Sequence, residues 1–286
     1  LEPRILNYAT VVEGLKTVAF RERFGTLHLT AGDHTLPGPF YQASGEVEEF
    51  GHPGLADIAF YNAMGLTANG IGNHEFDGGI NEFAQMLATA NYPFIAANLD
   101  LSNAELEEGT PSIEIGEDGG SVEENAGKIV RSAYVEVNGE KIGLIGRAPA
   151  DFFNVIEDPD TRMPGVDFYG GRNPADNQPL VSAVGQVLEQ VVLLEGKGIN
   201  KIILLDHAQD FTADPLSAQS LRGIDIVVAS GSTGFMANEN VEGPFNLLRP
   251  GDAPEAAYPT VREDSEGNTV VVVNSDQLYT YVGNLM

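Results

Sequence analysis

The chain has 286 residues and a net charge of −27, because 42 aspartates and glutamates outnumber 15 lysines and arginines. This balance leaves no basic surface for a nucleic acid polymer or an anionic membrane. The absence of cysteine excludes disulfides, thiolate metal ligands and a cysteine nucleophile. A hydrophobic content of 42% is typical of a globular protein, and no apolar run reaches the roughly 18 residues of a membrane span.

In the first part of the chain, predicted helices alternate with short apolar strands. The predicted elements are a helix over residues 8–23, a strand over 26–31, a helix over 55–64, a strand over 67–71, a helix over 80–90 and a strand over 93–97. We expect Gly65 to end the helix before it, as glycine in the left-handed conformation commonly does.

The second part of the chain is richer in β-structure. Residues 102–128 are rich in Glu, Gly and Ser and predict an irregular surface segment, whereas Asn138-Gly139 joins two alternating runs and predicts a β-hairpin. The other predicted elements are hairpin strands over 129–137 and 141–146, a loop over 149–177, helices over 179–195 and 213–221, and strands over 201–205, 224–229, 269–273 and 278–283. We expect one α/β domain over residues 1–286, with a pair of mixed sheets flanked by helices.

Polar side chains stand at the ends of two predicted strands. The block Gly72-Asn73-His74-Glu75-Phe76-Asp77 follows one strand, and Asp33 follows another. Open α/β sheets place their chemistry at the carboxyl ends of strands. There Asn73 can offer a neutral oxygen to a hard metal ion, and His74 can donate a proton to an oxyanion. The alternative is a polar turn with a hydrogen-bonded histidine.

Three blocks occur in a fixed order: Gly32-Asp33, Gly72 to Asp77, and Ala97-Asn98-Leu99-Asp100. They resemble the calcineurin-like metallophosphoesterases, and more closely the 5′-nucleotidase branch, whose blocks read GD, GNHEFD and ANLD. The runs Thr35–Pro39 and Leu248–Asp252 are similar to those of a bacterial subset known as nucleotidases or atypical alkaline phosphatases. The resemblance implies an α/β fold, a four-layer α/β/β/α sandwich with two mixed β-sheets.

The resemblance also implies a site for two divalent metal ions, which such enzymes hold about 3.5–4 Å apart. Asp33 would bridge the two ions, Asn73 and His207 would bind a metal, and His74 would be the catalytic residue beside the phosphate. For His207 the alternative is a strand-end histidine hydrogen-bonded to the backbone. The sequence does not distinguish Mn²⁺, Mg²⁺, Ca²⁺ and Zn²⁺.

Four further residues are predicted to bind substrate: His34, Asn98, Ser232 and Phe235. His34 directly follows the bridging carboxylate, and Asn98 belongs to the third block. Phe235 follows the loop that contains Ser232 and could stack on a base. The alternative for this ring is ordinary packing.

Two parts of the family pattern are missing. No Asp-x-His precedes Asp33, and the family's Gly-His-x-His is replaced by Ser230-Gly231-Ser232-Thr233-Gly234. Oxygen ligands in place of imidazoles favour Ca²⁺, Mg²⁺ or Mn²⁺ over Zn²⁺. Because the chain stops at Leu285-Met286, we also expect no C-terminal nucleotidase domain.

Two functions follow from these observations. The first is metal-dependent hydrolysis of a small phosphorylated substrate, such as a nucleotide, by in-line attack of a metal-bound hydroxide with no covalent protein intermediate. The second is a catalytically impaired metallophosphoesterase-fold module that acts in ligand binding or extracellular structure. The absence of cysteine does not fix a compartment, but an exported bacterial protein can have this acidic, cysteine-free composition, and we expect a secreted or periplasmic location.

Overall fold

The computed structural model describes residues 4–150, 152–168, 178–209, 220–232, 234–238, 248–249, 251–275 and 281–285. The helices are α1 (Arg4–Glu22), α2 (Pro39–Glu46), α3 (Leu55–Ala63), α4 (Gly79–Thr89), α5 (Phe152–Val155), α6 (Pro159–Arg162) and α7 (Gln178–Gly196), with the 3-10 turn η1 (His74–Phe76). The strands are β1 (Leu29–Ala31), β2 (Ala68–Gly70), β3 (Phe94–Ile95), β4 (Leu99–Asp100), β5 (Gly120–Ser121), β6 (Ile129–Val130), β7 (Ser132–Val137), β8 (Glu140–Arg147), β9 (Asp167–Phe168), β10 (Ile202–His207), β11 (Ile226–Ser230), β12 (Thr260–Glu263) and β13 (Thr269–Val273).

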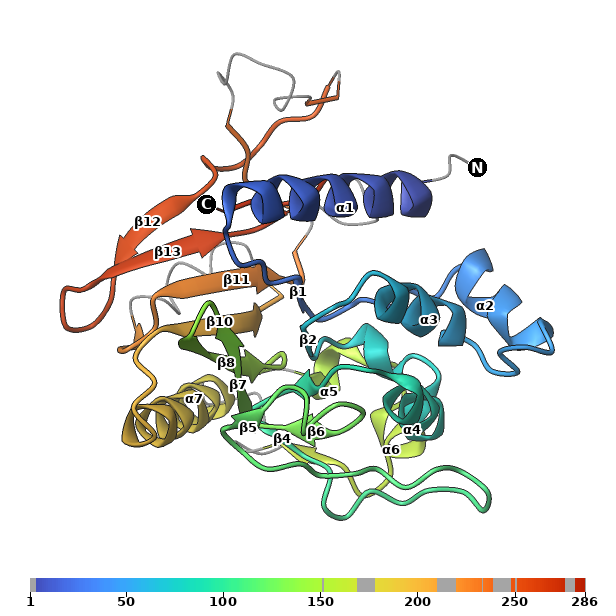
Figure 1. Ribbon diagram of the computed structural model, residues 1–286. Coiled ribbons are helices and arrows are strands. Elements are labelled where there is room, and N and C mark those ends of the chain that lie inside the picture. Colours follow the sequence, from blue (N-terminus) through green and yellow to red (C-terminus); the bar gives the residue numbers. More distant parts are fainter. Residues whose placement is uncertain are drawn as a thin grey trace.

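Two sheets form the centre of the molecule (Figure 1). The first sheet has the order β1-β2-β3-β6, and its strands are parallel. The second has the order β12-β13-β11-β10-β8-β7-β5 and mixes parallel with antiparallel pairs. A short third sheet pairs β4 with β9. The expected α/β fold with two sheets is confirmed. The second sheet is mixed as expected, whereas the first is wholly parallel.

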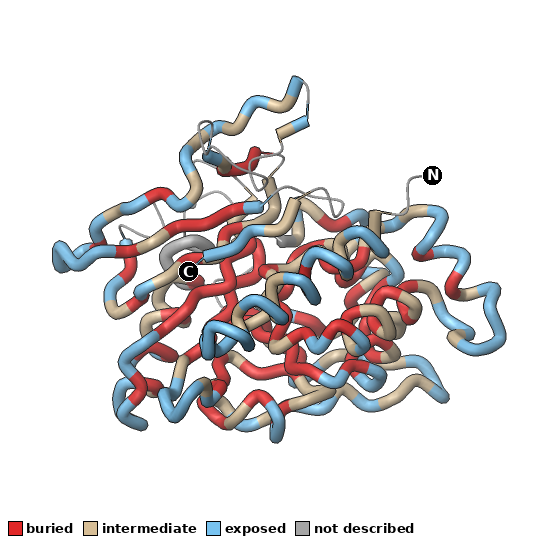
Figure 2. The backbone as a smooth tube through the Cα atoms, turned by 45° about the horizontal axis from the view of Figure 1, so that its top comes forward, coloured by how far each residue is buried: buried red, intermediate tan, exposed pale blue. Residues whose placement is uncertain are grey.

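Three apolar clusters explain why the layers stack. One cluster lies between the first sheet and α3 and α4, and includes Ile58, Phe83 and Phe94. A second joins the two sheets through side chains such as Ile95 and Leu205. A third packs α7 against the second sheet. The order of layers is therefore helix, sheet, sheet, helix, and Figure 2 shows the central strands buried and the outer segments exposed.

Local sequence signals set several boundaries. Gly65 has φ +62° directly after the C-cap of α3, as expected for a helix-ending glycine. Asn138 and Gly139 have φ +53° and +81° and join β7 to β8 in register, so the predicted hairpin is confirmed. None of the described helices is long and apolar enough to cross a membrane, and the predicted export of the chain stays a prediction.

Some predicted elements differ from the structure. The single strand expected over 129–137 is two strands, because the chain leaves the first sheet after β6 and enters the second at β7. The loop expected over 149–177 contains α5, α6 and β9. The helix expected over 213–221 lies almost entirely outside the described residues. The strand expected over 278–283 lies partly outside them, and the described residues 281–283 form no strand.

Candidate active site

The carboxyl ends of strands from both sheets meet at one edge of the molecule. In the first sheet, β1 leads into Asp33 and β2 into Asn73, and these two strands are parallel neighbours. In the second sheet, β10 ends at His207 and its parallel neighbour β11 ends at Ser230. The fold therefore gathers residues that are far apart in the sequence, as it does at the strand ends of other open α/β sheets.

Asp33 and His207 face each other across the two sheets. The distance between Asp33 Oδ2 and His207 Nε2 is 3.1 Å, and the imidazole is fully buried. His207 Nδ1 donates to the carbonyl oxygen of Ala31 at 2.7 Å, since a carbonyl can only accept. Burial lowers the pKa of His207, but the carboxylate of Asp33 and its hydrogen bonds outweigh this, so the pKa is raised.

Glycines allow this close approach. A Cβ atom on Gly72 would lie 2.2 Å from Asp33 Oδ1 and 2.5 Å from His207 Cε1. A Cβ atom on Gly32, whose φ is +93°, would lie 2.4 Å from the backbone nitrogen of Gly72. A larger residue at either position would push the carboxylate and the imidazole apart.

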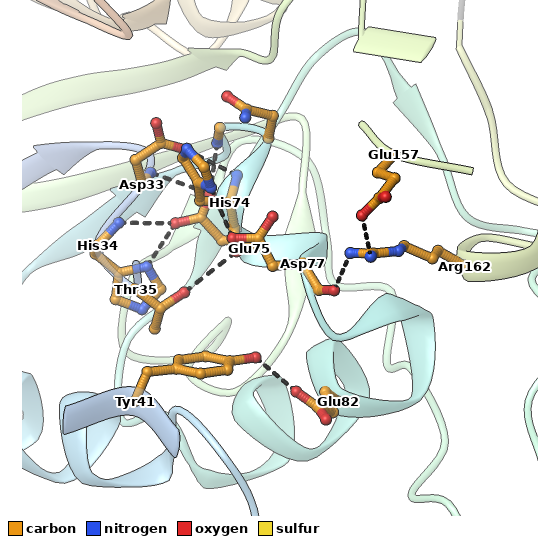
Figure 3. Close-up of polar contacts among 12 residues, drawn as sticks. Asp33, His34, Thr35, Tyr41, His74, Glu75, Asp77, Glu82, Glu157 and Arg162 are labelled. Atoms are coloured by element: carbon orange, nitrogen blue, oxygen red, sulfur yellow. Dashed lines mark hydrogen bonds and ion pairs between the residues drawn. The ribbon is translucent and has the colours of Figure 1, made fainter. Parts of the chain in front are cut away.

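His74 forms a pair with Asp77. Its Nδ1 lies 2.6 Å from Asp77 Oδ2, and its side chain is 34% exposed. The hydrogen bond to Asp77 raises the pKa of His74 to about 8, against the opposing effect of burial. Arg162 donates to the backbone carbonyl oxygen of Asp77 and so ties α6 to this loop (Figure 3). Asp77 therefore orients the imidazole of His74 and favours its protonated form.

Glu75 holds the two strand-end loops together. Its side chain is fully buried and accepts hydrogen bonds from the backbone N–H groups of Asp33, His34 and Gly72 at 3.1, 3.0 and 2.7 Å. His34 Nδ1 lies 2.7 Å from Glu75 Oε1, and Figure 3 shows the Glu75 carboxylate next to Asp33 and His34. Burial would raise the pKa of Glu75, but the hydrogen bond and charge of His34 lower it to about 2.

Asn73 is buried at the same edge of the sheets, and its side-chain amide accepts a hydrogen bond there. Gln209 Nε2 donates to Asn73 Oδ1, the oxygen that a metal ion would need. Both Gln209 and Asp33 have a left-handed backbone, with φ +63° and +55°. Non-glycine residues in this conformation occur preferentially at functional sites.

A cavity of about 1090 Å³ opens at this edge. Asp33, His74, Gln209 and Ser232 line it from the strand ends. Other lining residues come from α1 and from the segment that leads into α2. The cavity is much larger than a phosphate group, so the site has room for an organic substituent.

The four residues predicted to bind substrate lie in different environments in the structure. Ser232 lines the cavity. The amide of Asn98 is buried and makes both of its hydrogen bonds with the backbone of Ala148, at 2.9 and 2.8 Å. Phe235 is 8% exposed and stacks on Tyr281, with ring centroids 5.4 Å apart. For each of these residues the substrate contact stays a prediction.

His34, the fourth of these residues, has a fully buried side chain. Besides Glu75, its ring contacts the rings of Tyr61 and Phe94, each with a centroid distance of 5.3 Å. These contacts favour a role in fixing Glu75 and the loop after β1. The predicted substrate contact of His34 also stays a prediction.

The donor atoms of this edge fit a divalent cation. Nε2 of His207 is buried and has no hydrogen-bond partner within the described part of the chain, although it faces the carboxylate of Asp33. Once the imidazole is deprotonated, its Nε2 lone pair and the carboxylate are both metal ligands, and Asn73 adds a neutral oxygen on the same edge. In the described ranges no group of three or more His, Asp or Glu side chains is arranged to hold a metal ion. The two-metal arrangement therefore stays a prediction.

Sequence reasoning missed several residues that shape the site. Glu75 and Asp77 belong to the GNHEFD block. Asp77 follows His74 by three residues, and this spacing was the signal that the two side chains form a pair. Gln209 follows His207 by two residues and carried no signal. Arg147 also carried no signal in the sequence. It forms a buried bidentate ion pair with Asp206, the residue before His207, and the two partners are 59 residues apart.

Comparison with known proteins agrees with this geometry. The chain is 30% identical over 235 residues to a 5′-nucleotidase of Diplobatis ommata, covering 82% of this chain and 34% of that protein. It is 26% identical over 266 residues to a 5′-nucleotidase of Mus musculus, covering 93% of this chain and 38% of that protein. The crystal structure of a 5′-nucleotidase precursor from Thermus thermophilus matches with a TM-score of 0.66 and 25% identity, covering 90% of this chain and 41% of that one. No family model matches the chain.

The fold and the strand-end blocks are those of a calcineurin-like metallophosphoesterase domain. The chain belongs to the 5′-nucleotidase family and matches its N-terminal metallophosphoesterase region. It spans about a third to two fifths of the length of these three relatives.

Proposed function

We propose that this chain hydrolyses phosphomonoesters, such as nucleoside 5′-phosphates, at the cavity edge described above. The observation that carries the proposal is the close contact between Asp33 Oδ2 and His207 Nε2, which lie 3.1 Å apart and next to the His74–Asp77 pair. Membership of the 5′-nucleotidase family supports phosphoester hydrolysis, and the names of the relatives support a nucleotide substrate.

Asp33, Asn73 and His207 would hold a divalent ion, which when bound would supply an activated water molecule and neutralise phosphoryl charge. Asp33 is already oriented for this, because its Oδ1 accepts from the backbone N–H of His74 at 2.9 Å. His74, fixed by Asp77, would donate a proton to the leaving oxygen or a hydrogen bond to an equatorial phosphoryl oxygen. The oxygen-rich donor set favours Mg²⁺, Mn²⁺ or Ca²⁺ over Zn²⁺.

One observation favours the second candidate function, a binding module without turnover. Within the residues that the structure describes, no three-membered group of His, Asp or Glu converges on a metal position. A module of this kind would bind a phosphorylated ligand in the same cavity and release it unchanged.

The test is phosphate release from AMP and p-nitrophenyl phosphate after treatment with a chelator, with Mg²⁺, Mn²⁺, Ca²⁺ and Zn²⁺ added in turn. We expect turnover with at least one ion. His74→Ala should lower kcat by about 10²- to 10⁴-fold with unchanged metal content, since a positioned acid contributes about that much. Asp33→Asn should lower both the metal content and kcat.

His52→Ala is the matched control, because His52 is an exposed histidine in the loop before α3. It should leave both the metal content and kcat unchanged. If no ion supports turnover and elemental analysis finds no bound metal, the hydrolase proposal is wrong and the binding module remains. An unchanged kcat in His74→Ala would refute the acid role of that residue.

A further inference from the structure

Gln209 joins the two sheets at the edge of the cavity, and the proposed chemistry gives it no role. It follows the end of β10 by two residues and lines the same cavity as Asp33 and His74. Its side-chain Nε2 donates a hydrogen bond to Oδ1 of Asn73, a residue that follows β2. A side chain from the second sheet therefore contacts a predicted metal ligand from the first.

The hydrogen bond decides which end of the Asn73 amide faces Gln209. The oxygen and the NH₂ group of an asparagine are nearly the same in shape, so packing alone does not distinguish them. Only the oxygen can accept from Gln209 Nε2, and only the oxygen can bind a cation. An amide oxygen has two lone pairs. One accepts from Gln209, and the other stays available to a metal ion.

The backbone around Gln209 holds its amide in this direction. Gln209 has a left-handed backbone with φ +63°, a conformation that a residue with a side chain keeps only when its surroundings enforce it. Gly231, just past the end of β11, lies against this turn. A Cβ atom on Gly231 would lie 2.9 Å from the backbone nitrogen of Gln209 and 2.9 Å from His207 Nε2. The turn after β10 is therefore fixed by contacts with the neighbouring strand end.

The alternative is that Gln209 itself binds the metal ion through its own amide oxygen. In that arrangement Gln209 Oε1 would point toward the site that Asn73 Oδ1 also faces. The hydrogen bond shows the opposite orientation, with the donor Nε2 directed at Asn73. This orientation favours an indirect role, in which Gln209 holds a ligand in place as the hydrogen-bond partners of metal ligands commonly do.

We propose that Gln209 is a positioning residue for the metal site, which keeps the oxygen of Asn73 available to a divalent cation and so raises the affinity for that ion. This inference rests on the proposed hydrolase function and goes beyond it, because it assigns a role to a residue outside the predicted ligand set. It also means that the second sheet controls a ligand supplied by the first.

The experiment measures the dissociation constant for Mn²⁺, with Mg²⁺ and Ca²⁺ in parallel, by isothermal titration of the metal-free chain. Gln209→Gly should weaken binding by about 10- to 100-fold, the usual effect of removing a partner that orients a ligand. Glycine adopts a left-handed backbone readily, so this variant should fold normally. The matched control is Gln42→Ala, which removes an exposed glutamine side chain from α2 and should change the dissociation constant by less than about 2-fold.

The same substitution in an Asn73→Asp background separates the two roles of Gln209. A carboxylate presents an oxygen whichever way it turns, so it does not need Gln209 to select one. Gln209→Gly should therefore change the dissociation constant of the Asn73→Asp protein by less than about 3-fold. An equal loss in both backgrounds would overturn the positioning role and assign Gln209 as a ligand. Unchanged binding in the Asn73 background would overturn it as well.

Failure of the hydrolase proposal gives a different result. Metal affinity is measured without turnover, so the test holds for a chain that binds ions and cleaves nothing. If no ion binds, the hydrolase proposal has failed, and the hydrogen bond is tested by NMR of the side-chain amides, with the Asn73 signals assigned from Asn73→Asp. Signals that shift in Gln209→Gly and not in Gln42→Ala support the orientation of Asn73, whereas unchanged signals overturn it.

Discussion

The Arg147–Asp206 ion pair offers a controlled test of what burial does to a charge. Arg147 Nε and Nη2 bind the two carboxylate oxygens of Asp206 at 2.6 and 2.9 Å, and the side chains are 2% and 0% exposed. A second pair lies at the other end of these strands, where Glu140 begins β8 and Lys201 directly precedes β10. There Lys201 Nζ lies 2.6 Å from Glu140 Oε2, with side chains 53% and 66% exposed.

The two pairs have an N–O distance of 2.6 Å in common and differ in burial, in residue type and in the number of hydrogen bonds. Asp206→Asn removes the negative charge that pairs with the buried guanidinium of Arg147. Breaking such a buried pair costs about 3–5 kcal/mol, a large part of a typical stability of about 5–15 kcal/mol. Glu140→Gln should change the stability little, because water already solvates both charges.

Equilibrium unfolding in urea, followed by far-UV circular dichroism, measures both variants. The refuting result is a similar loss from Asp206→Asn and Glu140→Gln, which would mean that burial does not decide the energetics of these pairs. The double variant Arg147→Met with Asp206→Leu removes both charges and should recover most of the loss, because well-packed apolar residues often replace a buried pair without cost.

Three other predictions concern the glycine contact, a buried histidine and the interface between the sheets. Gly72→Ala should separate Asp33 from the second sheet and abolish activity, because its Cβ would lie 2.2 Å from Asp33 Oδ1. Burial and then the charge of Lys16 lower the pKa of His28 from 6.5 to about 4, so protonation favours the unfolded chain. The free energy of unfolding should therefore fall by about 3 kcal/mol between pH 6.5 and pH 4, as measured by urea unfolding against His28→Gln. Leu205→Ala and Leu194→Ala should each destabilise by about 2–5 kcal/mol, but only Leu205→Ala should also lower kcat/KM at temperatures where both stay folded.

Each of these predictions has its own control. Gly14→Ala, in α1 and with nothing within 4 Å of the added Cβ, should keep activity and raise stability by about 0.5–1 kcal/mol. For the pH series, a parallel decline in His28→Gln and the unmodified protein would assign the pH dependence to other groups. Leu205 lies between the two sheets and Leu194 between α7 and the second sheet, so equal losses of activity would show that the sheet interface does not position the site.

Much of the fold was predictable because its signals are local. The helices α3 and α4 and the strand β13 follow from apolar spacing and from turn residues such as Gly65. The two-residue hairpin follows from the conformations that Asn138 and Gly139 readily adopt. The break between β6 and β7 could not be predicted, because either sheet suits the apolar residues on both sides and only the tertiary packing decides.

The candidate site was predictable to a similar degree. The GNHEFD block placed Asn73 and His74 at a strand end, and the strand before His207 placed that imidazole on the same edge. The role of Glu75 depends on hydrogen-bond partners that are distant in the sequence. It is not visible in a linear chain, because hydrogen-bond satisfaction is a property of the folded state.

The arrangement of the sheets explains why the site depends on partners distant in the sequence. The first sheet supplies Asp33 and the His74 loop, which Glu75 ties together through backbone N–H groups. The second sheet supplies His207, whose Nδ1 nevertheless binds a carbonyl of the first sheet, that of Ala31. This hydrogen bond fixes the imidazole relative to the opposite sheet. The distance between Asp33 and His207 is therefore set by how the two sheets pack, so changes deep in the interface between them should reach the chemistry without touching any residue that binds substrate.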